Sequence, residues 1–202
     1  DGIMIRTFEQ SDVEALAEFG SIPIINGLTD LLHPCQVLAD LLTIKEHFGD
    51  LAGRKLAYVD DGNNMAHSLL YGCVKGGMDV SIATPAEYAC DETVVKNATL
   101  DAEKTGAKVL ITQDAKEAVT DADVIYTDVW VSMGEPDEVW EERIRDLTPY
   151  KVTMDAMNKA GEQAIFLHCL PSYHDLKTEI GKEIDIYIPK YHLAIEPGSW
   201  EL

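Results

Sequence analysis

The regular alternation of apolar runs with amphipathic segments after residue 54 is the feature that most constrains the fold of this chain. Apolar runs occupy residues 55–59, 79–83, 108–112, 123–127 and 164–170, and amphipathic segments occupy 64–75, 92–105, 115–120 and 137–147. The runs lack the polar alternate residue of half-exposed strands, as is typical of parallel strands covered on both faces. The alternation therefore predicts an α/β fold with a doubly wound parallel sheet.

A shorter strand–helix pattern precedes this domain. We expect strands at 2–8 and 22–25, and a short helix that opens at the capping-box sequence Ser-Asp-Val-Glu (11–14) and ends at residue 19. A longer helix should begin at Pro34, a favoured first helical residue, and end near residue 48. Its expected apolar side carries Val37, Leu38, Leu41, Leu42 and Ile44. The polar stretch 49–54 is the expected domain boundary.

Composition excludes several classes of partner and site. The net charge of −20 argues against nucleic acid and against anionic membrane surfaces as partners. Four widely spaced cysteines without a Cys-x-x-Cys pair predict free thiols in a reducing cytoplasm, and neither a disulfide framework nor a zinc site. No apolar run approaches the roughly 18 residues of a membrane span. The chain is therefore expected to be a cytoplasmic globular protein.

Two of the predicted strands lead into polar segments that allow two interpretations each. Ligands of open parallel sheets bind outside the carboxyl ends of the strands. Residues 60–64 (Asp-Asp-Gly-Asn-Asn) follow one strand without a G-x-G-x-x-G fingerprint, so Asn64 and its neighbour could cap the next helix or bind an amino-acid head group. Asp128 follows another strand and could pair with a ligand ammonium, with Ser132 in a closing loop, or belong to a turn beside a core tryptophan.

Cysteine and histidine side chains mark two further places. The last apolar run ends in His-Cys-Leu-Pro (168–171), where Cys169 is either a core residue or part of a ligand site. His33 and Gln36 lie at the start of the longer N-terminal helix, where the helix dipole favours an anion or a developing oxyanion. Arg6, at the end of the first strand, is a basic residue that could complete an anion pocket.

Four stretches together resemble the ornithine carbamoyltransferases of the aspartate/ornithine carbamoyltransferase family. They are His-Pro-Cys-Gln (33–36), Asp-Gly-Asn-Asn (61–64), Asp-x-Trp-x-Ser-Met-Gly (128–134) and His-Cys-Leu-Pro (168–171). The similarity extends from about residue 1 to about residue 183, and the Ser-Met-Gly loop favours ornithine over aspartate. The resemblance implies that residues 1–48 end a carbamoyl phosphate-binding α/β domain and that 49–183 form an ornithine-binding α/β domain.

The resemblance also implies a reaction and a set of site residues. The reaction is carbamoyl transfer from carbamoyl phosphate to the δ-amine of L-ornithine, which gives L-citrulline and phosphate in arginine metabolism without a metal or cofactor. The implied carbamoyl phosphate ligands are Arg6, His33, Gln36, Cys169 and Leu170, and the implied ornithine ligands are Asn64, Asp128, Ser132, Met133 and Cys169. Among these, Cys169, His33 and Arg6 are the implied catalytic residues. A trimer-based homo-oligomer is implied for the full-length protein.

The chain also departs from the family pattern. The family's Ser-Thr-Arg-Thr phosphate loop and its late Glu-Asn-Arg element do not occur in these 202 residues, and residues 184–202 form an expected divergent or truncated tail. Together with the missing initiator Met, this predicts a fragment of a longer protein. Two alternatives therefore stand beside the ornithine reaction. One is a non-catalytic chain that binds an amino acid or a partner subunit, and the other is a carbamoyltransferase for another amine such as putrescine.

Overall fold

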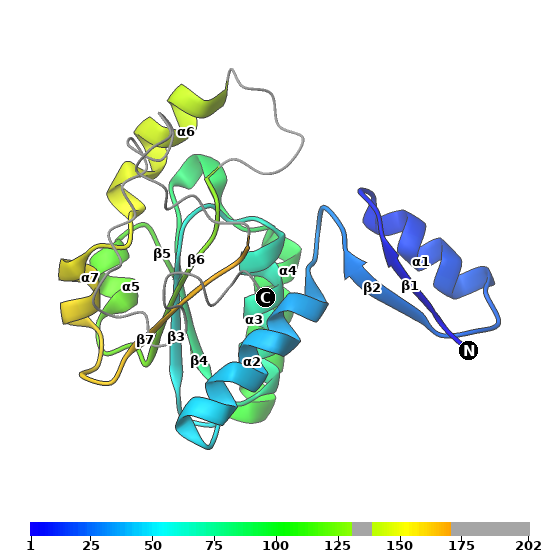
Figure 1. The fold of residues 1–202 in the computed structure, drawn as a ribbon, viewed down its shortest axis with the longest axis horizontal. Coiled ribbons are helices and arrows are strands. Elements are labelled where there is room, and N and C mark those ends of the chain that lie inside the picture. The colour runs from blue at the N-terminus through cyan, green and yellow to red at the C-terminus, as the bar shows by residue number, and fades with distance from the viewer. Residues whose placement is uncertain (131–138, 171–202) are drawn as a thin grey trace, which may run out of the picture. The chain divides into compact units, whose positions relative to one another are not determined.

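The computed structural model of the chain describes residues 1–130 and 139–170, and Figure 1 shows their fold. The strands are β1 (Ile3–Arg6), β2 (Ile24–Leu28), β3 (Lys55–Val59), β4 (Asp79–Ala83), β5 (Val109–Thr112), β6 (Val124–Thr127) and β7 (Ile165–His168). The α-helices are α1 (Gln10–Phe19), α2 (Pro34–Phe48), α3 (Asn64–Lys75), α4 (Glu92–Thr105), α5 (Ala115–Val119), α6 (Trp140–Leu147) and α7 (Met154–Lys159), with short 3₁₀ helices η1 (Ala86–Tyr88) and η3 (Thr148–Tyr150). No helix in the described ranges is long and apolar enough to cross a membrane.

The chain divides into two compact units. The first comprises residues 1–53, 62–80 and 88–109, and the second comprises 54–61, 81–87 and the described part of 110–202. The first unit therefore holds β1, β2 and helices α1 to α4, and the second holds β3, β6, β7 and helices α5 to α7, while β4 and β5 are divided between them.

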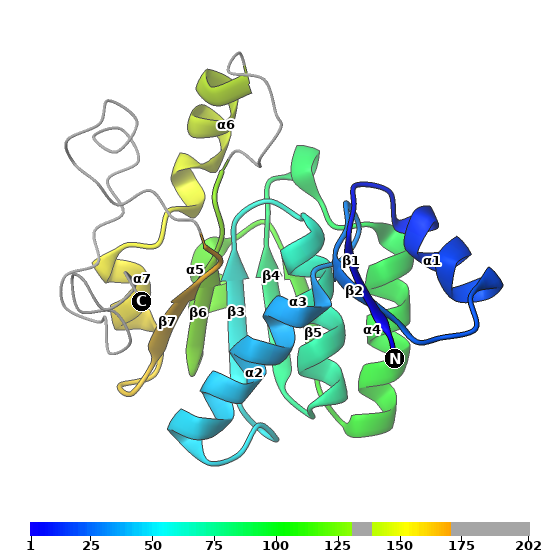
Figure 2. The same ribbon diagram turned by 45° about the vertical axis from the view of Figure 1, so that its right-hand side comes forward.

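The strand order is that of a doubly wound sheet. The strands β5-β4-β3-β6-β7 form a five-stranded parallel sheet, and β1 and β2 form a separate parallel pair (Figure 2). From β3 the chain adds β4 and then β5 on one side, and it then places β6 and β7 on the other side. The carboxyl ends of β3 and β6 therefore flank the point where the winding reverses, which is where open α/β sheets bind ligands. The predicted fold class is confirmed.

The pairing register aligns the ends of β3, β6 and β7. Tyr126 of β6 lies opposite Tyr58 of β3 and Leu167 of β7, and Thr127 of β6 lies opposite His168 of β7. Parallel strands in register finish at a common edge of the sheet. The segments that follow these three strands, all of which the sequence singled out for chemistry, therefore begin side by side in the second unit.

Side chains on both faces of β3 are buried. Ala57 and Val59 belong to a core cluster with Ile125 of β6, Phe166 of β7, and side chains of α5 and α7. Leu56 and Tyr58 alternate with them and therefore point to the opposite face, where both are 0% exposed. Fully burying a large apolar side chain contributes about 1.5–3 kcal/mol. The expectation of strands covered on both faces is thus correct for β3.

Helix α2 begins at Pro34 and ends at Phe48, as predicted. Its buried face carries Val37, Leu41 and Ile44, which follow the i, i+4, i+7 spacing of a single helical stripe. Leu38 and Leu42 are 67% and 56% exposed, so their assignment to the apolar face was wrong. They lie one residue beyond the stripe, and a step of one residue turns the side chain by about 100°.

Helix α2 packs against α3, and Gly72 permits the close contact between the two helices. A Cβ on Gly72 would lie 2.4 Å from Cγ1 of Val37 and 3.2 Å from Cδ1 of Leu41. Glycine inside a helix costs about 0.5–1 kcal/mol relative to alanine. Here that cost is offset by contact between α3 and the buried stripe of α2.

Two N-terminal expectations were wrong in detail. Helix α1 starts at Gln10, before the supposed capping box, and no side chain caps it from the residue before the helix. Instead, the Gln10 N–H donates to Asp30 Oδ1 at 3.0 Å, an acceptor 20 residues away in sequence. Strand β2 also continues through Asn26 and Gly27 to Leu28, beyond its expected end at residue 25. A Cβ at Gly27 would lie 3.0 Å from the Ile5 carbonyl oxygen, so glycine permits the strand contact.

Gly62 occupies a position with no room for a side chain. Its N–H donates to the Tyr88 carbonyl at 2.7 Å, which holds the turn after β3 against residues 88–90. An added Cβ would lie 2.3 Å from the Cys90 nitrogen and 2.6 Å from the Tyr88 oxygen, both of them backbone atoms. The glycine of the Asp-Gly-Asn-Asn stretch is therefore required by close backbone packing in the first unit.

We predict that Gly62→Ala lowers the free energy of unfolding by about 1–3 kcal/mol, because backbone atoms must move to admit the methyl group. The matched control is Gly76→Ala, because Gly76 has φ −80° and its added Cβ would meet neighbours at 3.4 Å, an ordinary contact. The control should change stability by less than about 1 kcal/mol. Chemical denaturation of both variants measures the difference, and equal losses would contradict the close packing at Gly62.

Candidate functional site

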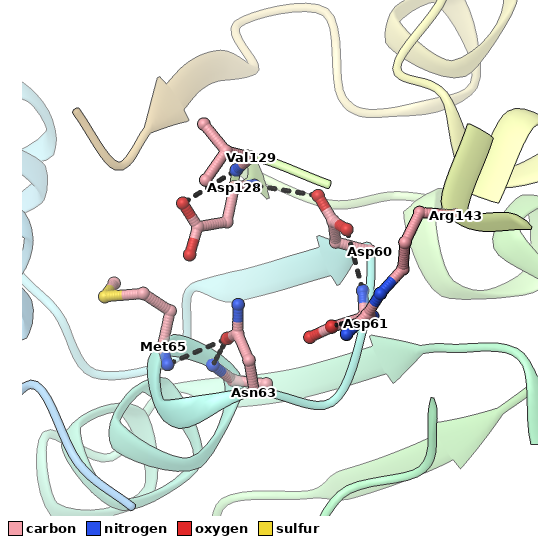
Figure 3. Close-up of polar contacts among 8 residues, drawn as sticks. Asp60, Asp61, Asn63, Met65, Asp128, Val129 and Arg143 are labelled. Carbon is pink, nitrogen blue, oxygen red and sulfur yellow. Dashed lines mark hydrogen bonds and ion pairs between the residues drawn. The ribbon is translucent and has the colours of Figure 1, made fainter. Parts of the chain in front are cut away.

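The carboxyl ends of β3 and β6 carry three aspartates that share a hydrogen-bond network (Figure 3). Asp60 is fully buried, and its Oδ1 accepts the Asp61 N–H at 2.8 Å. Its Oδ2 accepts the Asp128 N–H at 3.0 Å and lies 2.8 Å from the Thr127 hydroxyl. Burial raises the pKa of Asp60 well above its ordinary value of 3.8, with smaller contributions from Asp61 and Asp128. The network fixes the backbone at the winding reversal of the sheet.

The side chain of Asp128 is held by its own segment. Its Oδ1 accepts the backbone N–H of Val129 at 2.8 Å, and the residue is 8% exposed. Trp130, two residues further, is 6% exposed and therefore a core tryptophan. The segment was interpreted either as a turn beside a core tryptophan or as a place where Asp128 pairs with a ligand ammonium. The two are compatible, because Trp130 is buried in the core while the Asp128 carboxylate is held in a defined orientation.

An ion pair joins α6 to the end of β3. The Arg143 guanidinium donates to the Asp61 carboxylate, and the two side chains are 16% and 13% exposed (Figure 3). Arg143 lies in the helix that follows residues 131–138, the segment of the Ser-Met-Gly stretch. The pair supplies a positive charge to a group of aspartates that would otherwise repel one another.

Cys169 lies beside Asp128 at the edge of the sheet. It is 6% exposed, and its N–H donates to the Thr127 carbonyl at 3.3 Å, which extends the β6–β7 pairing by one residue. The His168 ring makes a hydrogen bond to the Cys169 carbonyl, and its ring packs edge-on against Phe166. Leu170 is 58% exposed. Cys169 is therefore a buried residue that also lies at the carboxyl edge of the sheet, where open α/β sheets bind ligands.

The paired amides after β3 have different roles in the first unit. Asn63 caps α3, because its Oδ1 accepts the N–H groups of Met65 at 2.9 Å and Ala66 at 3.2 Å (Figure 3). Asn64 is the first residue of α3, and its amide nitrogen donates to the Thr29 carbonyl at 2.7 Å. The capping interpretation is thus confirmed for Asn63, and Asn64 is the amide that capping does not require.

The start of α2 groups a second set of predicted residues in the first unit. His33 precedes the helix, and the Ser68 hydroxyl oxygen accepts its N–H at 2.7 Å. Burial lowers the pKa of His33 below 6.5, and the nearby Arg6 guanidinium lowers it further. No described residue hydrogen-bonds His33 Nδ1, which is buried. The neutral imidazole favoured here can still donate a hydrogen bond to a ligand oxygen.

Gln36, the other predicted residue at this helix start, points to an internal partner. Its amide nitrogen donates to Oδ1 of Asp40, one turn further along α2, at 2.9 Å. Asp40 in turn is one cause of the raised pKa of Cys73, after burial of the thiol. Gln36 thus contributes to the helix as well as to the predicted anion site.

The structure places the predicted site residues in two groups. Arg6 and His33 are electrostatic neighbours in the first unit, and Asp128 and Cys169 adjoin in the second. Ser132 and Met133 lie outside the described residues. Asp60 and Arg143 were not predicted, although an Asp-Asp pair directly after a buried strand was visible in the sequence. Within the described ranges, no cluster of three or more His, Cys, Asp or Glu side chains could hold a metal ion.

Comparison with known sequences relates both parts of the chain to one family. The family model described as aspartate/ornithine carbamoyltransferase, Asp/Orn binding domain, matches residues 52–191, and the model described as the carbamoyl-P binding domain of the same family matches residues 1–46. A Treponema denticola protein named "Ornithine carbamoyltransferase, catabolic" is 53% identical over 186 residues, which cover 92% of this chain and 55% of that protein. The chain spans a little over half the length of such relatives.

Solved structures of similar proteins have the same fold over this length. The ornithine carbamoyltransferase of Pyrococcus furiosus superposes with a TM-score of 0.82 at 44% identity, covering 89% of this chain and 59% of that one. The enzyme of Gloeobacter violaceus gives a TM-score of 0.78 at 49% identity, covering 85% and 57%. Sequence and fold thus agree on the same group of relatives.

We predict that Arg143→Met lowers the free energy of unfolding by about 2–4 kcal/mol, because it leaves the buried Asp61 carboxylate without its counter-charge. Arg145→Met is the matched control in the same helix, since Arg145 is 68% exposed and pairs at the surface with Asp146 and Glu142. The control should cost less than about 1 kcal/mol. Urea denaturation compares the two, and similar small losses would contradict a stabilising role of the buried pair.

We predict that His33 makes stability depend on pH. Its pKa in the folded chain lies below 6.5, so the unfolded chain binds more protons between the folded pKa and 6.5. The contribution is fully present above pH 6.5 and is lost as the pH falls through the folded pKa. The slope is at most about 1.4 kcal/mol per pH unit. His33→Asn should flatten the unfolding free energy over this window, and a pH profile left unchanged by this substitution would refute the prediction.

Proposed function

The chain belongs to the aspartate/ornithine carbamoyltransferase family, and we propose that it serves the transfer of a carbamoyl group from carbamoyl phosphate to the δ-amine of L-ornithine. The products are L-citrulline and phosphate. The observation that carries this proposal is that Asp128 and Cys169 directly follow the paired ends of β6 and β7, where the Cys169 N–H donates to the Thr127 carbonyl. An aspartate and a thiol there suit an amino-acid substrate with two amines.

Asp128 is the proposed anchor of ornithine. Its oriented, buried carboxylate suits an ammonium group, because a charge-assisted hydrogen bond is stronger and more directional than a neutral one. Cys169 orients the amine on the adjoining strand end. Asn64 adds an amide oxygen at the start of α3, and Ser132 and Met133 complete the proposed ornithine ligands.

Arg6, His33 and Gln36 are the proposed carbamoyl phosphate ligands, together with Cys169 and the backbone carbonyl of Leu170. Support comes from the Arg6–His33 pair, in which the cation favours a neutral imidazole. A guanidinium and an imidazole N–H together can stabilise negative charge on the carbamoyl oxygen as it develops. Catalytic roles accordingly fall to Arg6, His33 and Cys169.

The reaction can be written with these groups alone. The lone pair of the neutral δ-amine forms a bond to the carbamoyl carbon, and the carbonyl oxygen becomes an oxyanion held by Arg6 and His33. The tetrahedral intermediate then expels phosphate with the C–O bonding electrons, and the amine nitrogen passes its surplus proton to the departing phosphate. Orientation of the amine and oxyanion stabilisation supply the rate acceleration. No redox step occurs, and the proposal assigns no cofactor or metal.

Domain organisation, assembly and location follow as parts of the same proposal. Residues 1–48 would end a carbamoyl phosphate-binding domain, 49–183 would form the ornithine-binding domain, and 184–202 would form a tail. The two family matches, which lie on either side of residue 49, support this boundary. A homo-oligomer built on trimers and a cytoplasmic location complete the proposal, the latter supported by free cysteines at 35, 73, 90 and 169.

We predict that Asp128→Asn in the full-length parent raises the KM for ornithine about 10- to 100-fold, because one charge-assisted contact contributes roughly 1.5–3 kcal/mol. The KM for carbamoyl phosphate should change much less. The control is Asp155→Asn, an exposed residue of α7 that should leave both constants unchanged. Steady-state citrulline assays measure these constants. Absence of citrulline formation by the parent, or preferred carbamoylation of putrescine, would refute the ornithine reaction.

A second candidate is that the 202-residue chain alone binds an amino acid or a partner subunit without catalysis. It is favoured by the absence of a Ser-Thr-Arg-Thr sequence in the chain and by its coverage of 55% of a relative's length. Phosphate release from carbamoyl phosphate by the purified chain in the presence of ornithine would exclude this candidate. Calorimetric binding of ornithine without turnover would support it.

A further inference from the structure

A fully buried carboxyl group at the end of β3 has no part in the proposed carbamoyl transfer. Asp60 is 0% exposed, and Figure 3 shows it between Asp61 and Asp128. Each of its two oxygens accepts a backbone N–H, from Asp61 at 2.8 Å and from Asp128 at 3.0 Å. A single side chain thus joins the segments that follow β3 and β6.

The oxygen contacts around Thr127 require one more hydrogen than threonine supplies. Thr127 Oγ1 lies 2.8 Å from Asp60 Oδ2 and 2.9 Å from the Val59 carbonyl oxygen. A hydroxyl has one hydrogen, and a carbonyl oxygen has none. Both contacts become hydrogen bonds only if Asp60 donates a proton to Thr127 while Thr127 donates to Val59. If Asp60 were ionised, one of these two oxygen–oxygen contacts would have no hydrogen between its atoms. That contact would then be repulsive.

The charges around Asp60 favour the same protonation state. The negative charges that face Asp60 belong to Asp61, the next residue in the chain, and to Asp128, which follows β6. From β4, the Ala83 carbonyl accepts the Asp60 N–H at 3.3 Å. Arg143 of α6 pairs with Asp61. Burial, followed by the two neighbouring carboxylates, raises the pKa of Asp60 by more than the Thr127 and Asp61 hydrogen bonds lower it, so Asp60 favours the protonated form that the hydrogen count requires.

We propose that Asp60 is a neutral acid whose proton, given to Thr127, positions Asp128 for the ammonium group of an amino-acid substrate, an inference that rests on the proposed ornithine reaction. The acid fixes the Asp128 backbone through its N–H, and Val129 then orients the carboxylate. Because Asp60 is uncharged, it does not repel a negative charge on Asp128. Asp128 therefore remains the charged ligand. Asp60 is a positioning residue and does not touch substrate.

The proton on Asp60 is tested by ¹³C NMR titration of the side-chain carboxyl carbons in the 202-residue chain. The Asp60 carbon should keep the chemical shift of a protonated acid at pH 7, and Asp60→Asn assigns the signal by removing it. This readout needs no enzymatic activity. A carbon that titrates below pH 5, in the range of ordinary aspartate, overturns the proposal.

The positioning role is tested with two variants at Thr127 in the full-length parent. Thr127→Val removes the hydroxyl that accepts the proton, and it should raise the KM for ornithine about tenfold while the KM for carbamoyl phosphate changes less than twofold. Thr127→Ser retains the hydroxyl and should restore the wild-type ornithine KM. An unchanged ornithine KM in Thr127→Val, or an equal rise in both KM values, overturns the positioning role.

Failure of the proposed reaction can be distinguished from failure of this inference. If the parent forms no citrulline, the carbamoyl transfer proposal fails, and the NMR titration still decides whether Asp60 carries a proton. If citrulline forms and the Asp60 carbon titrates as an ordinary aspartate, the reaction stands and the role of Asp60 is refuted.

Discussion

The parallel pairing of β3 with β6 is the constraint on which the rest of the second unit depends. It places the segments after both strands at one edge of the sheet, and these segments carry three aspartates, of which Asp60 accepts backbone N–H groups from the other two. Three carboxylates at this spacing in a buried site would repel one another strongly. The fold reduces this repulsion by giving each of the three carboxyl groups different surroundings. Asp60 is buried with raised proton affinity, Asp61 is paired with Arg143, and Asp128 is oriented by a backbone donor.

The different environments of the three aspartates explain why the Arg143 cation is important for stability in a very acidic chain. The sequence has 36 acidic and 16 basic residues, so its carboxylates outnumber the cations that could pair with them. Asp61 is only 13% exposed and cannot rely on water. Arg143 therefore has an effect that surface ion pairs such as Lys104–Asp101 lack, because exposed pairs are screened by solvent. Because Arg143 belongs to α6, its ion pair with Asp61 also attaches α6 to the edge of the sheet where the predicted ligand residues lie.

The sequence predicted the periodic elements well and the contacts between distant segments poorly. Helices α3 and α4 and strand β4 have the predicted bounds, because apolar spacing and Asn or Asp caps are local signals. The start of α1 was misplaced because its acceptor is Asp30, twenty residues away. Asp60 and Arg143 were missed for the same reason: a buried acid and a solvated one are identical in sequence, and only the β3–β6 pairing and the approach of α6 distinguish them.

The candidate site also shows that structural and ligand interpretations of a residue need not exclude each other. Cys169 is a buried thiol, yet its backbone N–H donates to the Thr127 carbonyl and thereby holds it at the carboxyl edge of the sheet, as its predicted ligand role requires. Of the two amides after Gly62, Asn63 caps the helix, and this frees Asn64 from that task. Packing therefore determines which side chains can approach a ligand. The orienting role proposed for Cys169 needs only a rigid strand end, because a correctly oriented amine can react without a covalent intermediate.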